Sequence, residues 1–256
     1  DGVHSSARIE DIKGAEVIRR MGEGEVAVIA GFQGISPNNR VTTLGRGGSD
    51  ITAVGLASAL NADRCDIYTD VDGVYTADPR IVTAAKKLDR ITYEEMLEMA
   101  SQGARVLQTR SVELAMNHRV RVQVLSSFNN SPGTLVVDED EIVEQAVVSG
   151  ITYASDEAKV TLLRVSDRPG VAAAIFGPLA DANVNVDMIV QSASPDGTTT
   201  DMTFTVTRGD LPRVQTILKE RRESVGFDEI IADGDVVKVS VIGVGMRSHA
   251  GVAQRM

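Results

Sequence analysis

The first half of the chain alternates short apolar runs with helical patterns. The runs Val26–Ala30, Cys65–Thr69 and Val120–Leu125 have the length and apolar content of strands. Between the first two, Ile51–Leu60 carries small or apolar residues on every face, which is typical of a buried helix. Alternating strands and helices predict an α/β structure, and we expect its strands to be buried on both faces.

Capping and turn residues add further elements to this half. Thr92 and Glu95 have the spacing of a capping box, which predicts a helix over Tyr93–Ala100. A second helix is expected over roughly Ala104–Asn117. After the turn sequence NNSPG, a short strand is expected at Leu135–Val137.

The second half of the chain repeats itself. The acidic run Asp138–Glu141, which we interpret as an exposed linker, leads to KVTLLRV at Lys159, and the similar KVSVIGV begins at Lys238. The first copy predicts strand, helix, strand, strand, helix and strand over Lys159–Val165, Val171–Ala182, Asn185–Ser192, Thr199–Val206, Leu211–Ser224 and Asp228–Ala232. This βαββαβ order is the ferredoxin-like split motif. The second copy has only a strand and the start of a helix, which cannot bury their own apolar face, so we expect a piece of a longer polypeptide.

Composition narrows the range of partners and compartments. The 256 residues carry a formal net charge of −10 and a pI near 4.8, which argue against nucleic acid or an anionic membrane surface as a partner. No apolar run approaches the roughly 20 residues of a membrane helix. The single cysteine, Cys65, fits a reducing cytoplasm, and its apolar strand pattern predicts a buried, inert thiol. The three histidines lack the spacing of metal ligands, so no metal ligand is assigned.

The decade VTTLGRGGSD, from Val41 to Asp50, is the strongest candidate for a binding site. Ser49 and Asp50 both suit the N-cap of the helix that follows. The loop ahead of them contains Gly45, Gly47 and Gly48. Such a loop lets backbone N–H groups approach an anion, the helix N-terminus adds partial positive charge, and Arg46 adds a charged fork. A mobile surface loop with a solvated arginine is the alternative, but the coincidence of cap, helix and arginine favours a site for an anionic small molecule.

A second polar segment, TDVDGVYTADPR, runs from Thr69 to Arg80 at the end of a predicted strand. In an open α/β sheet, ligands gather beyond the carboxyl ends of the strands. Thr69 and Asp70 are suited to hydrogen-bond a base or sugar. Tyr75 can pack on a ring, and Arg80 can reach a phosphate.

The same segment has a structural interpretation as well. A hairpin turn at Asp72–Gly73 followed by a rigid corner at Asp78–Pro79 would account for its glycine and proline. A turn does not explain the tyrosine, aspartates and arginine together, so we favour a nucleotide-binding segment. Asp70 and Asp72 are not assigned to a metal, because such a pair on a turn is usually solvated.

Four polar residues of the repeat are candidate ligand-binding residues. Asp167 lies in the link SDRPG, where it can interact with the N-terminus of the following helix. Asn185, Asp187 and Gln191 recur at even spacing along the next predicted strand and are therefore expected on one face. From spacing alone, these side chains either hold an amino-acid ligand or line a wet edge, and both interpretations stay open.

Together and in this order, VTTLGRGGSD, TDVDGVYTADPR, SDRPG and NVNVDMIVQ resemble the aspartokinases. The resemblance covers essentially all 256 residues and is to the type in which an amino-acid-kinase domain precedes two ACT regulatory domains. It implies an α/β fold in three parts. These are the C-terminal portion of an amino-acid-kinase sheet sandwich over residues 1–140, a ferredoxin-like βαββαβ ACT domain with its linker strand over 141–234, and the start of a second ACT domain over 235–256.

The resemblance also implies an activity. It is phosphoryl transfer from ATP, with Mg²⁺, to the side-chain carboxylate of L-aspartate, which gives 4-phospho-L-aspartate in the first step toward lysine, threonine and methionine. The glycine loop would bind aspartate: Arg46 would clamp a carboxylate, and Asp50 would be a catalytic carboxylate. The residues that close around the substrate would be Gly47, Gly48 and Ser49.

By the same resemblance, ATP would lie against the second segment. The implied ATP-binding residues are Thr69, Asp70, Tyr75, Thr76, Ala77, Asp78, Pro79, Arg80 and Arg105. Arg105 stands where the family often has lysine, and the two cations are not equivalent. The family's Lys-Phe-Gly-Gly-Thr phosphate loop and its Gly-Glu element are absent from these residues. We therefore expect the 256 residues alone to be inactive.

The ACT resemblance implies control by an end product. Threonine and/or lysine would bind, in a homo-oligomer or in subunits paired through their ACT domains. The implied effector-binding residues are Asp167, Ala172, Asn185, Val186, Asp187 and Gln191. A non-catalytic ACT-type amino-acid-sensing subunit is the alternative, but it would need neither of the two kinase segments. Another amino-acid kinase, such as glutamate 5-kinase, is disfavoured by the ACT tandem.

Overall fold

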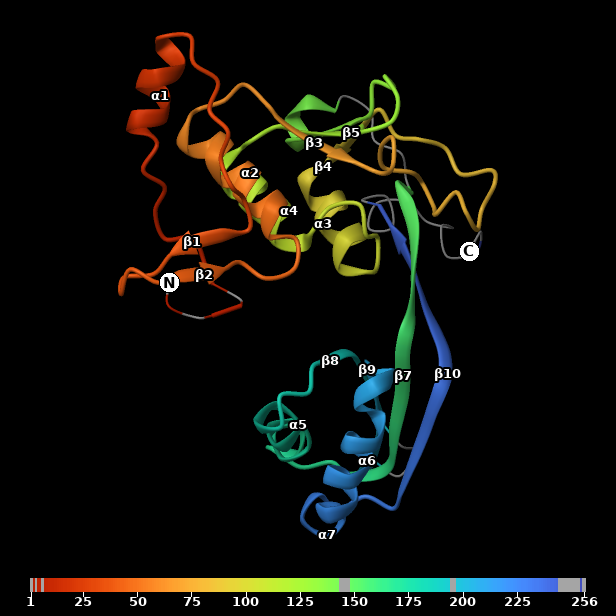
Figure 1. Cartoon of the computed structure of the whole chain (residues 1–256). Coiled ribbons are helices and arrows are strands. Elements are labelled where there is room, and N and C mark those ends of the chain that lie inside the picture. The colour runs from red at the N-terminus through yellow and green to blue at the C-terminus, as the bar shows by residue number, and fades with distance from the viewer. Residues whose placement is uncertain are drawn as a thin grey trace. The chain divides into compact units, whose positions relative to one another are not determined.

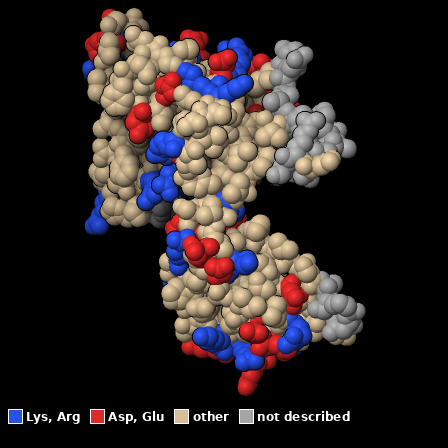
Figure 2. Space-filling model, turned by 90° about the vertical axis from the view of Figure 1, so that its right-hand side faces the viewer, with Lys and Arg blue, Asp and Glu red and all other residues tan. Residues whose placement is uncertain are grey.

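The computed structural model describes residues 2, 4–5, 7–142, 148–193, 197–243 and 254. By its internal contacts the chain divides into two compact units, which consist of Asp1–Thr152 with Ser240–Met256, and of Tyr153–Val239. Each unit has its own hydrophobic core. Basic and acidic side chains are interspersed over the face that Figure 2 shows. Among the described residues, no helix has the length and apolar character that a membrane crossing needs.

The first unit is built on a mixed four-stranded sheet. Its strands are β3 (Cys65–Thr69), β4 (Arg90–Thr92), β5 (Val122–Ser126) and β6 (Thr134–Val137). They lie in the order β3-β5-β6-β4, with β3 parallel to β5, β4 parallel to β6, and β5 antiparallel to β6. The helices beside this sheet are α2 (Gly48–Ala59), α3 (Tyr93–Ser101) and α4 (Thr109–His118) (Figure 1). The remaining elements are α1 (Ala15–Gly22), the antiparallel pair β1 (Gln33–Ile35) and β2 (Val41–Thr43), and the 3-10 turn η1 (Glu139–Glu141).

The core of this unit lies between the helices and one face of the sheet. Met96 of α3, Ala115 of α4 and Val124 of β5 are fully buried. Along β5, buried and half-buried residues alternate, as in a strand with one face on the core. Tyr68 of β3 is 64% exposed. The expectation that the strands are buried on both faces is therefore wrong for the described part of the chain.

The predicted strand Val26–Ala30 is not formed. These residues have no regular secondary structure, and Val26 and Val28 are 89% and 95% exposed. An apolar run becomes a strand only when a neighbouring strand pairs with its backbone groups, and none of the described strands does so. The composition is that of a strand, but the tertiary partner that would order it is not among the described residues.

Local signals predicted one helix of this unit closely and misplaced the starts of two others. α3 begins with the expected capping box: the Glu95 N–H donates to the Thr92 hydroxyl at 3.2 Å, and the Thr92 N–H donates to the Glu95 carboxylate at 3.3 Å. α2 begins at Gly48 instead of Ile51, and α4 at Thr109 instead of Ala104. The chain is extended just before α4, where Leu107 is buried in the core.

The acidic run Asp138–Glu141 is tied to the sheet. The Glu141 carboxylate lies 3.0 Å from the guanidinium of Arg121, which directly precedes β5, and 3.8 Å from that of Arg90, the first residue of β4. Glu141 is consequently half-buried. The interpretation of this run as a simple exposed linker is wrong for this residue, because two arginines distant in sequence reach it.

The second unit has the ferredoxin-like order that the repeat predicted. Its elements are β7 (Gly150–Ser166), α5 (Val171–Asp181), β8 (Val186–Ala193), β9 (Thr199–Thr207), η2 (Arg208–Asp210), α6 (Leu211–Glu220), α7 (Arg222–Val225) and β10 (Glu229–Ile242). The sheet order is β10-β7-β9-β8, and α5 and α6 cover one of its faces (Figure 1). The predicted helix Leu211–Ser224 is interrupted at Arg221.

Strand β10 is longer than predicted. It runs on to Ile242 and so includes Lys238, where the second copy of the repeat was expected to begin. The start of the second copy thus continues the last strand of the first. Apart from Gly243 and Gln254, the remainder of the second copy, including Gly251, lies outside the described residues.

The core of the second unit forms around β9. Phe204 of this strand is fully buried, as are Ile175 and Leu179 of α5 and Val214 of α6. The ring of Phe176 meets the ring of Phe204 edge-to-face, with centroids 5.3 Å apart. Both helices therefore bury their apolar faces on the same side of the sheet.

Candidate functional site

The glycine loop is closely packed. Gly45 and Gly47 have φ values of +82° and +70°, a region that favours glycine. Gly47 is the N-cap of α2, and the N–H of Gly48 donates to the carbonyl of Gly45 at 3.0 Å. A Cβ at Gly47 would lie 1.8 Å from Cγ of Gln108. These contacts favour a built site over the alternative of a loose surface loop.

Ser49 and Asp50 lie inside the first turn of α2, so the prediction that they cap this helix is wrong. Neither side chain makes a capping hydrogen bond, and the Ser49 hydroxyl donates to the Asp50 carboxylate at 3.3 Å. That carboxylate also accepts a hydrogen bond from the backbone of Gln108, the N-cap of α4. The partially positive N-terminal ends of two helices therefore meet at Asp50.

Burial dominates the electrostatics of Asp50. It raises the pKa of this carboxyl above the ordinary value, while the hydrogen bonds from the Ser49 hydroxyl and the Gln108 backbone act in the opposite direction. Keeping a carboxylate in such surroundings costs folding free energy. Perturbed ionisable groups of this kind cluster at functional sites.

Two exposed arginines belong to the segments that meet at this point. Arg46 directly precedes Gly47, and Arg105 stands three residues before Gln108. Because Gly47 packs against Gln108, Arg46 adjoins the contact between the two helix N-termini, and Arg105 belongs to the irregular segment that leads into α4. Two permanent cations next to two helix N-termini form an arrangement that can bind a carboxylate and a phosphate.

Phe32 is a neighbour of this loop that the sequence analysis missed. It has a left-handed φ of +72°, its carbonyl accepts the N–H of Leu44 at 2.9 Å, and its own N–H donates to the Thr52 hydroxyl at 3.0 Å. A Cβ at Gly48 would lie 2.8 Å from the Phe32 ring, which therefore lies against the start of α2. In the sequence GFQG, the glycines Gly31 and Gly34 that flank Phe32 were the signal that would have drawn attention to it.

The predicted nucleotide segment contains an ordered polar cluster. The Tyr75 hydroxyl donates to the Asp72 carboxylate at 2.9 Å, and the Lys87 ammonium donates to the same carboxylate at 3.1 Å. Lys87 also hydrogen-bonds the Ser131 hydroxyl and pairs with Tyr75 in an antiparallel bridge. Burial acts to raise the pKa of Asp72, but the hydrogen bonds from Tyr75 and Lys87 outweigh it and lower that pKa. Lys87, which the sequence did not single out, thus helps to orient Tyr75.

The chain reverses later than predicted. The hairpin turn expected at Asp72–Gly73 is wrong, since the reversal lies between the bridged residues Tyr75 and Lys87. It includes the expected corner at Asp78–Pro79, where the Asp78 carbonyl accepts two backbone N–H groups of the following turn at 3.0 and 2.9 Å. Gly73 permits a close approach instead, because a Cβ there would lie 2.6 Å from the Thr134 hydroxyl oxygen.

The other predicted nucleotide-binding residues lie in or beside this loop. Thr69 and Asp70 stand at the carboxyl end of β3, and the Thr69 hydroxyl donates to the Asp70 carboxylate at 3.2 Å. The guanidinium of Arg80 donates to both oxygens of the Asp78 carboxylate, at 3.0 and 2.8 Å, and lowers its pKa. The Arg80 side chain is 85% exposed and that of Asp78 is 19% exposed, so the pair joins a half-buried carboxylate to a guanidinium at the surface. Thr76, Ala77 and Pro79 lie in the same loop.

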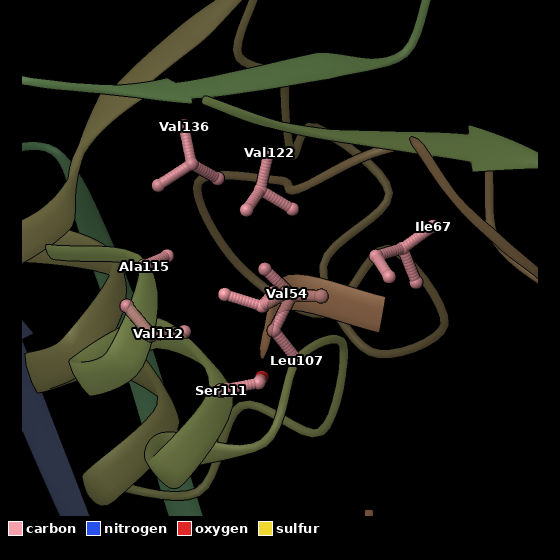
Figure 3. Close-up of a pocket in the computed structure, with 8 residues that line it drawn as sticks. All are labelled: Val54, Ile67, Leu107, Ser111, Val112, Ala115, Val122 and Val136. Carbon is pink, nitrogen blue, oxygen red and sulfur yellow. The ribbon is translucent and has the colours of Figure 1, made fainter. Parts of the chain in front are cut away.

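A shared apolar core connects the two predicted segments. Val54 of α2, Ile67 of β3 and Leu107, which follows Arg105 by two residues, line one small cavity. Figure 3 shows these side chains together with Ser111, Val112, Ala115, Val122 and Val136. The cavity has no room for a water molecule, so it is a packing gap between α2, α4 and the sheet. Through this core, the carboxyl end of β3 is held beside the segment that carries Arg105.

An open depression of about 570 Å³ lies away from these residues. Its lining residues are Met21, Ala62, Asp63, Arg64, Asp66, Arg121 and Leu135. Arg64 and Arg121 each directly precede one of the parallel strands β3 and β5, so the depression lies at the amino ends of these strands. Thr69 and Asp70 lie at the opposite, carboxyl end. The depression is therefore separate from the candidate site.

Cys65 is buried, as predicted. Burial raises the pKa of its thiol to about 11. The thiol is therefore protonated near neutral pH, which accords with an inert residue and not with a nucleophile.

A β-bulge changes the faces of β8. One extra residue lies between Val186 and Ile189 in the pairing with β9. Such an insertion reverses the face on which later side chains lie. Gln191 shares a face with Val186, because the β9 partners of both are buried. The expectation that Asn185, Asp187 and Gln191 share one face is therefore wrong.

The predicted effector residues fall into two groups. Asp167, at the end of β7, donates its N–H to the Thr198 carbonyl just before β9. Asp167, Ala172 and Gln191 belong to this end of the unit, and Asn185, Val186 and Asp187 to the opposite end of β8. Five residues of strand span roughly 17 Å. A single small amino acid is too short to contact both groups in one unit.

Asp187 is engaged by a lysine of β10. Lys238 forms ion pairs with Asp187 and, at 3.4 Å, with Glu157. The side chains of Lys238 and Glu157 are only 12% and 13% exposed, whereas that of Asp187 is 57% exposed. Burial acts to lower the pKa of Lys238, but the two carboxylates outweigh it and raise that pKa.

Comparison with known proteins supplies the family. Residues 1–126 match the amino acid kinase family, and residues 159–223 match the ACT domain. The aspartate kinase of Pseudomonas fluorescens is 53% identical over 257 residues, an alignment that covers all of this chain and 62% of that protein. The chain thus spans about three-fifths of the length of this relative.

Two solved structures of E. coli aspartokinase III, each 33% identical in sequence, are similar in fold. The complex with aspartate and ADP superposes with a TM-score of 0.75, covering 93% of this chain and 53% of that one. The complex with lysine and aspartate gives 0.72, covering 90% and 51%. The chain therefore belongs to the aspartokinase family, with an amino acid kinase region followed by an ACT domain.

Proposed function

We propose that this chain forms part of an aspartate kinase, which transfers a phosphoryl group from MgATP to the side-chain carboxylate of L-aspartate. The observation that carries the proposal is the meeting of two helix N-termini at Asp50, beside the exposed Arg46 and Arg105. A substrate with two carboxylates and a nucleotide with three phosphates both need such positive potential. The related E. coli enzyme was solved with aspartate and ADP.

In this proposal each segment has its own part in the reaction. Arg46 binds a carboxylate of aspartate through its guanidinium fork, while the backbone of Gly47, Gly48 and Ser49 closes around the substrate. Asp50 orients the reacting groups. Phosphoryl transfer depends mainly on alignment and on neutralising phosphate charge, so most of the contribution expected from these residues is positioning.

The nucleotide is proposed to lie along the loop after β3. Thr69 and Asp70 would hydrogen-bond the base or sugar, and Tyr75, oriented by Asp72, would pack on a ring. Arg80 and Arg105 would reach phosphate oxygens, with Arg80 leaving Asp78 to do so. Thr76, Ala77, Asp78 and Pro79 would shape this side of the site. We assign Mg²⁺ to the nucleotide and to no protein ligand.

We propose further that the ACT region binds an end product, threonine and/or lysine, and lowers the activity in the cytoplasm. E. coli aspartokinase III was solved with lysine. Because the predicted effector residues form two groups at opposite ends of β8, we infer that a pocket needs one group from each of two paired ACT units. This arrangement accords with a homo-oligomer.

The test of the proposed activity is Arg46→Ala in the full-length protein, with Arg40→Ala as the matched control on the exposed turn before β2. Acyl phosphate formed from aspartate and ATP is trapped with hydroxylamine. We expect kcat/KM for aspartate to fall by about 10²–10³-fold in Arg46→Ala, since a preorganised charge partner is lost. The control should stay near the wild-type value. Near-normal kcat/KM in Arg46→Ala would remove this loop from the aspartate site.

A further inference from the structure

Arg110, in the first turn of α4, holds two distant parts of the backbone. One guanidinium nitrogen, Nη1, donates to the carbonyl of Leu44 at 2.7 Å, and Nη2 donates to the carbonyl of Ala7 at 3.0 Å. Arg110 is half-buried, and both of these hydrogen bonds are to backbone carbonyls of segments distant in sequence. Its contacts are therefore directed at backbone carbonyls.

Leu44 leads into the glycine loop, and the segment at Ala7 pairs with the same stretch of backbone. The N–H of Ala7 donates to the Thr43 carbonyl at 3.0 Å, and the N–H of Leu44 donates to the Phe32 carbonyl at 2.9 Å. Ala7 and Leu44 are buried at 1% and 3% exposure in a small cluster with Ile51 of α2. The backbone that leads into Gly45 and Arg46 is thus fastened on one side by Phe32 and on the other by Arg110.

We propose that Arg110 is a positioning residue for the loop that carries Arg46. The proposal rests on the aspartate site described under the proposed function. Leu44 stands two residues before Arg46, so the direction of its carbonyl sets the course of the chain into the loop. A planar guanidinium reaches two carbonyls from different segments at once, which a lysine ammonium with a single point charge does less rigidly. Fixing this backbone keeps Arg46 at the distance and angle that the substrate carboxylate needs.

A role in folding alone predicts different kinetics from a role in positioning. If Arg110 only stabilised the fold, its loss would lower the amount of active enzyme and leave the KM values of both substrates unchanged. A displaced glycine loop weakens the contacts to aspartate and leaves the nucleotide segment after β3 in place. A misplacement of about 1 Å at a reacting group can cost about 10²-fold in rate.

The experiment compares Arg110→Met and Arg110→Lys with Arg119→Met in the full-length enzyme. Arg119 is the C-cap of the same helix and has a side chain 80% exposed, so its variant controls for loss of a cation from α4. We expect kcat/KM for aspartate to fall by about 10²-fold in Arg110→Met, through a higher KM and a lower kcat, with KM for ATP changed less than about twofold. Arg110→Lys should recover part of this loss, and Arg119→Met should match the wild type.

Several outcomes would overturn the proposal. One is a folded Arg110→Met enzyme with unchanged kinetics toward aspartate, and another is equal changes of KM for aspartate and ATP. If Arg110→Met does not fold, Arg110→Lys provides the same comparison, with a selective rise of KM for aspartate expected and an unchanged KM contradicting it. If the wild-type full-length enzyme does not phosphorylate aspartate, the proposed function itself is wrong, and so is the role of Arg110 that rests on it.

Discussion

At the scale of single residues, the candidate site contains groups whose surroundings in the folded chain cost folding free energy. Asp50 illustrates this, because burial raises its pKa even though Ser49 and the Gln108 backbone donate to it. Gly47 cannot be replaced by a larger residue without strain, because its φ is +70° and Gln108 occupies the space where a Cβ would lie. Phe32 accepts a strained left-handed backbone beside them. Backbone strain next to the glycine loop, together with a half-buried carboxylate in the first turn of α2, is typical of a binding site.

The raised pKa of Asp50 predicts a stability change with a definite sign. The folded state binds the Asp50 proton more tightly than the unfolded state does. This contribution is present below the unfolded pKa and is lost as the pH rises through the folded pKa. Near pH 7, the ionised carboxylate therefore costs stability. We expect Asp50→Asn to raise the unfolding temperature of the 256-residue chain near pH 7, with the gain shrinking toward about pH 4.

Thermal unfolding at both pH values tests this prediction, with the exposed Asp63→Asn as the control. In the full-length enzyme the same Asp50→Asn change should strongly lower kcat for aspartate phosphorylation. A variant that is less stable than the wild type near pH 7 would show that the hydrogen bonds to Asp50 outweigh its burial.

At the scale of elements, the β8 bulge decides which predicted effector residues share a face of the sheet. The length of β10 decides which of them already has an ion-pair partner. The bulge after Val186 moves Gln191 to the other face of the sheet. The extension of β10 brings Lys238 to Asp187 and Glu157, so that the last strand is joined by ion pairs to β7 and β8. Asp187, a predicted effector residue, already has a cation as its partner. Any effector ammonium at this position has to compete with Lys238.

Loss of Lys238 is expected to weaken the second unit. Lys238→Met leaves the mostly buried Glu157 without its cation, so the free energy of unfolding should fall by about 1–2 kcal/mol near neutral pH. The pKa of Lys238 is raised in the folded state, so its contribution persists through neutral pH and is lost only as the pH rises through that pKa. In acid, where the carboxylates become protonated, the difference should diminish.

Urea denaturation of the 256-residue chain measures this effect. Lys159→Met is the matched control, because Lys159 lies on β7 and is exposed. Equal losses for the two variants would mean that the Lys238 ion pairs contribute no more than an ordinary surface charge.

At the scale of the whole molecule, the chain is shorter than its relatives, spanning 62% of the P. fluorescens enzyme. Its segment of exposed apolar residues, with Val26 and Val28 nearly fully exposed, has no strand partner among the described residues. The site proposed here contains the aspartate and nucleotide segments but not the phosphate loop of the family, whose motif is absent from the 256 residues.

We therefore expect the 256-residue chain alone to form no acyl phosphate from aspartate and ATP. Phosphoryl transfer requires cations around the transferring group, and the lysine of the family's phosphate loop is one of them. Trapping with hydroxylamine, with the full-length enzyme as the positive control, is the measurement. Acyl phosphate formed by the 256-residue chain would show that Arg46, Arg105 and Arg80 supply enough positive charge for phosphoryl transfer without that lysine.

Much of the fold follows from local sequence. β3 was predicted at its observed bounds, and α3 with its capping box nearly so, because an apolar strand run and a Thr–Glu cap act over a few residues. The ferredoxin-like order of the second unit follows from the alternation of its apolar positions. The glycine loop with Arg46 and Asp50 was recognisable because glycines, an arginine and a helix start stand next to one another.

Tertiary structure alone decided the rest. Val26–Ala30 has the composition of a strand, but pairing depends on a second strand that local sequence does not contain. The bulge in β8 depends on its register with β9 and thereby separates Gln191 from Asn185. The contact of Arg110 with Leu44 and Ala7 joins residues 66 and 103 positions apart. Periodicity and capping describe short-range order, whereas these features arise where distant segments pack, and only the folded chain brings them together.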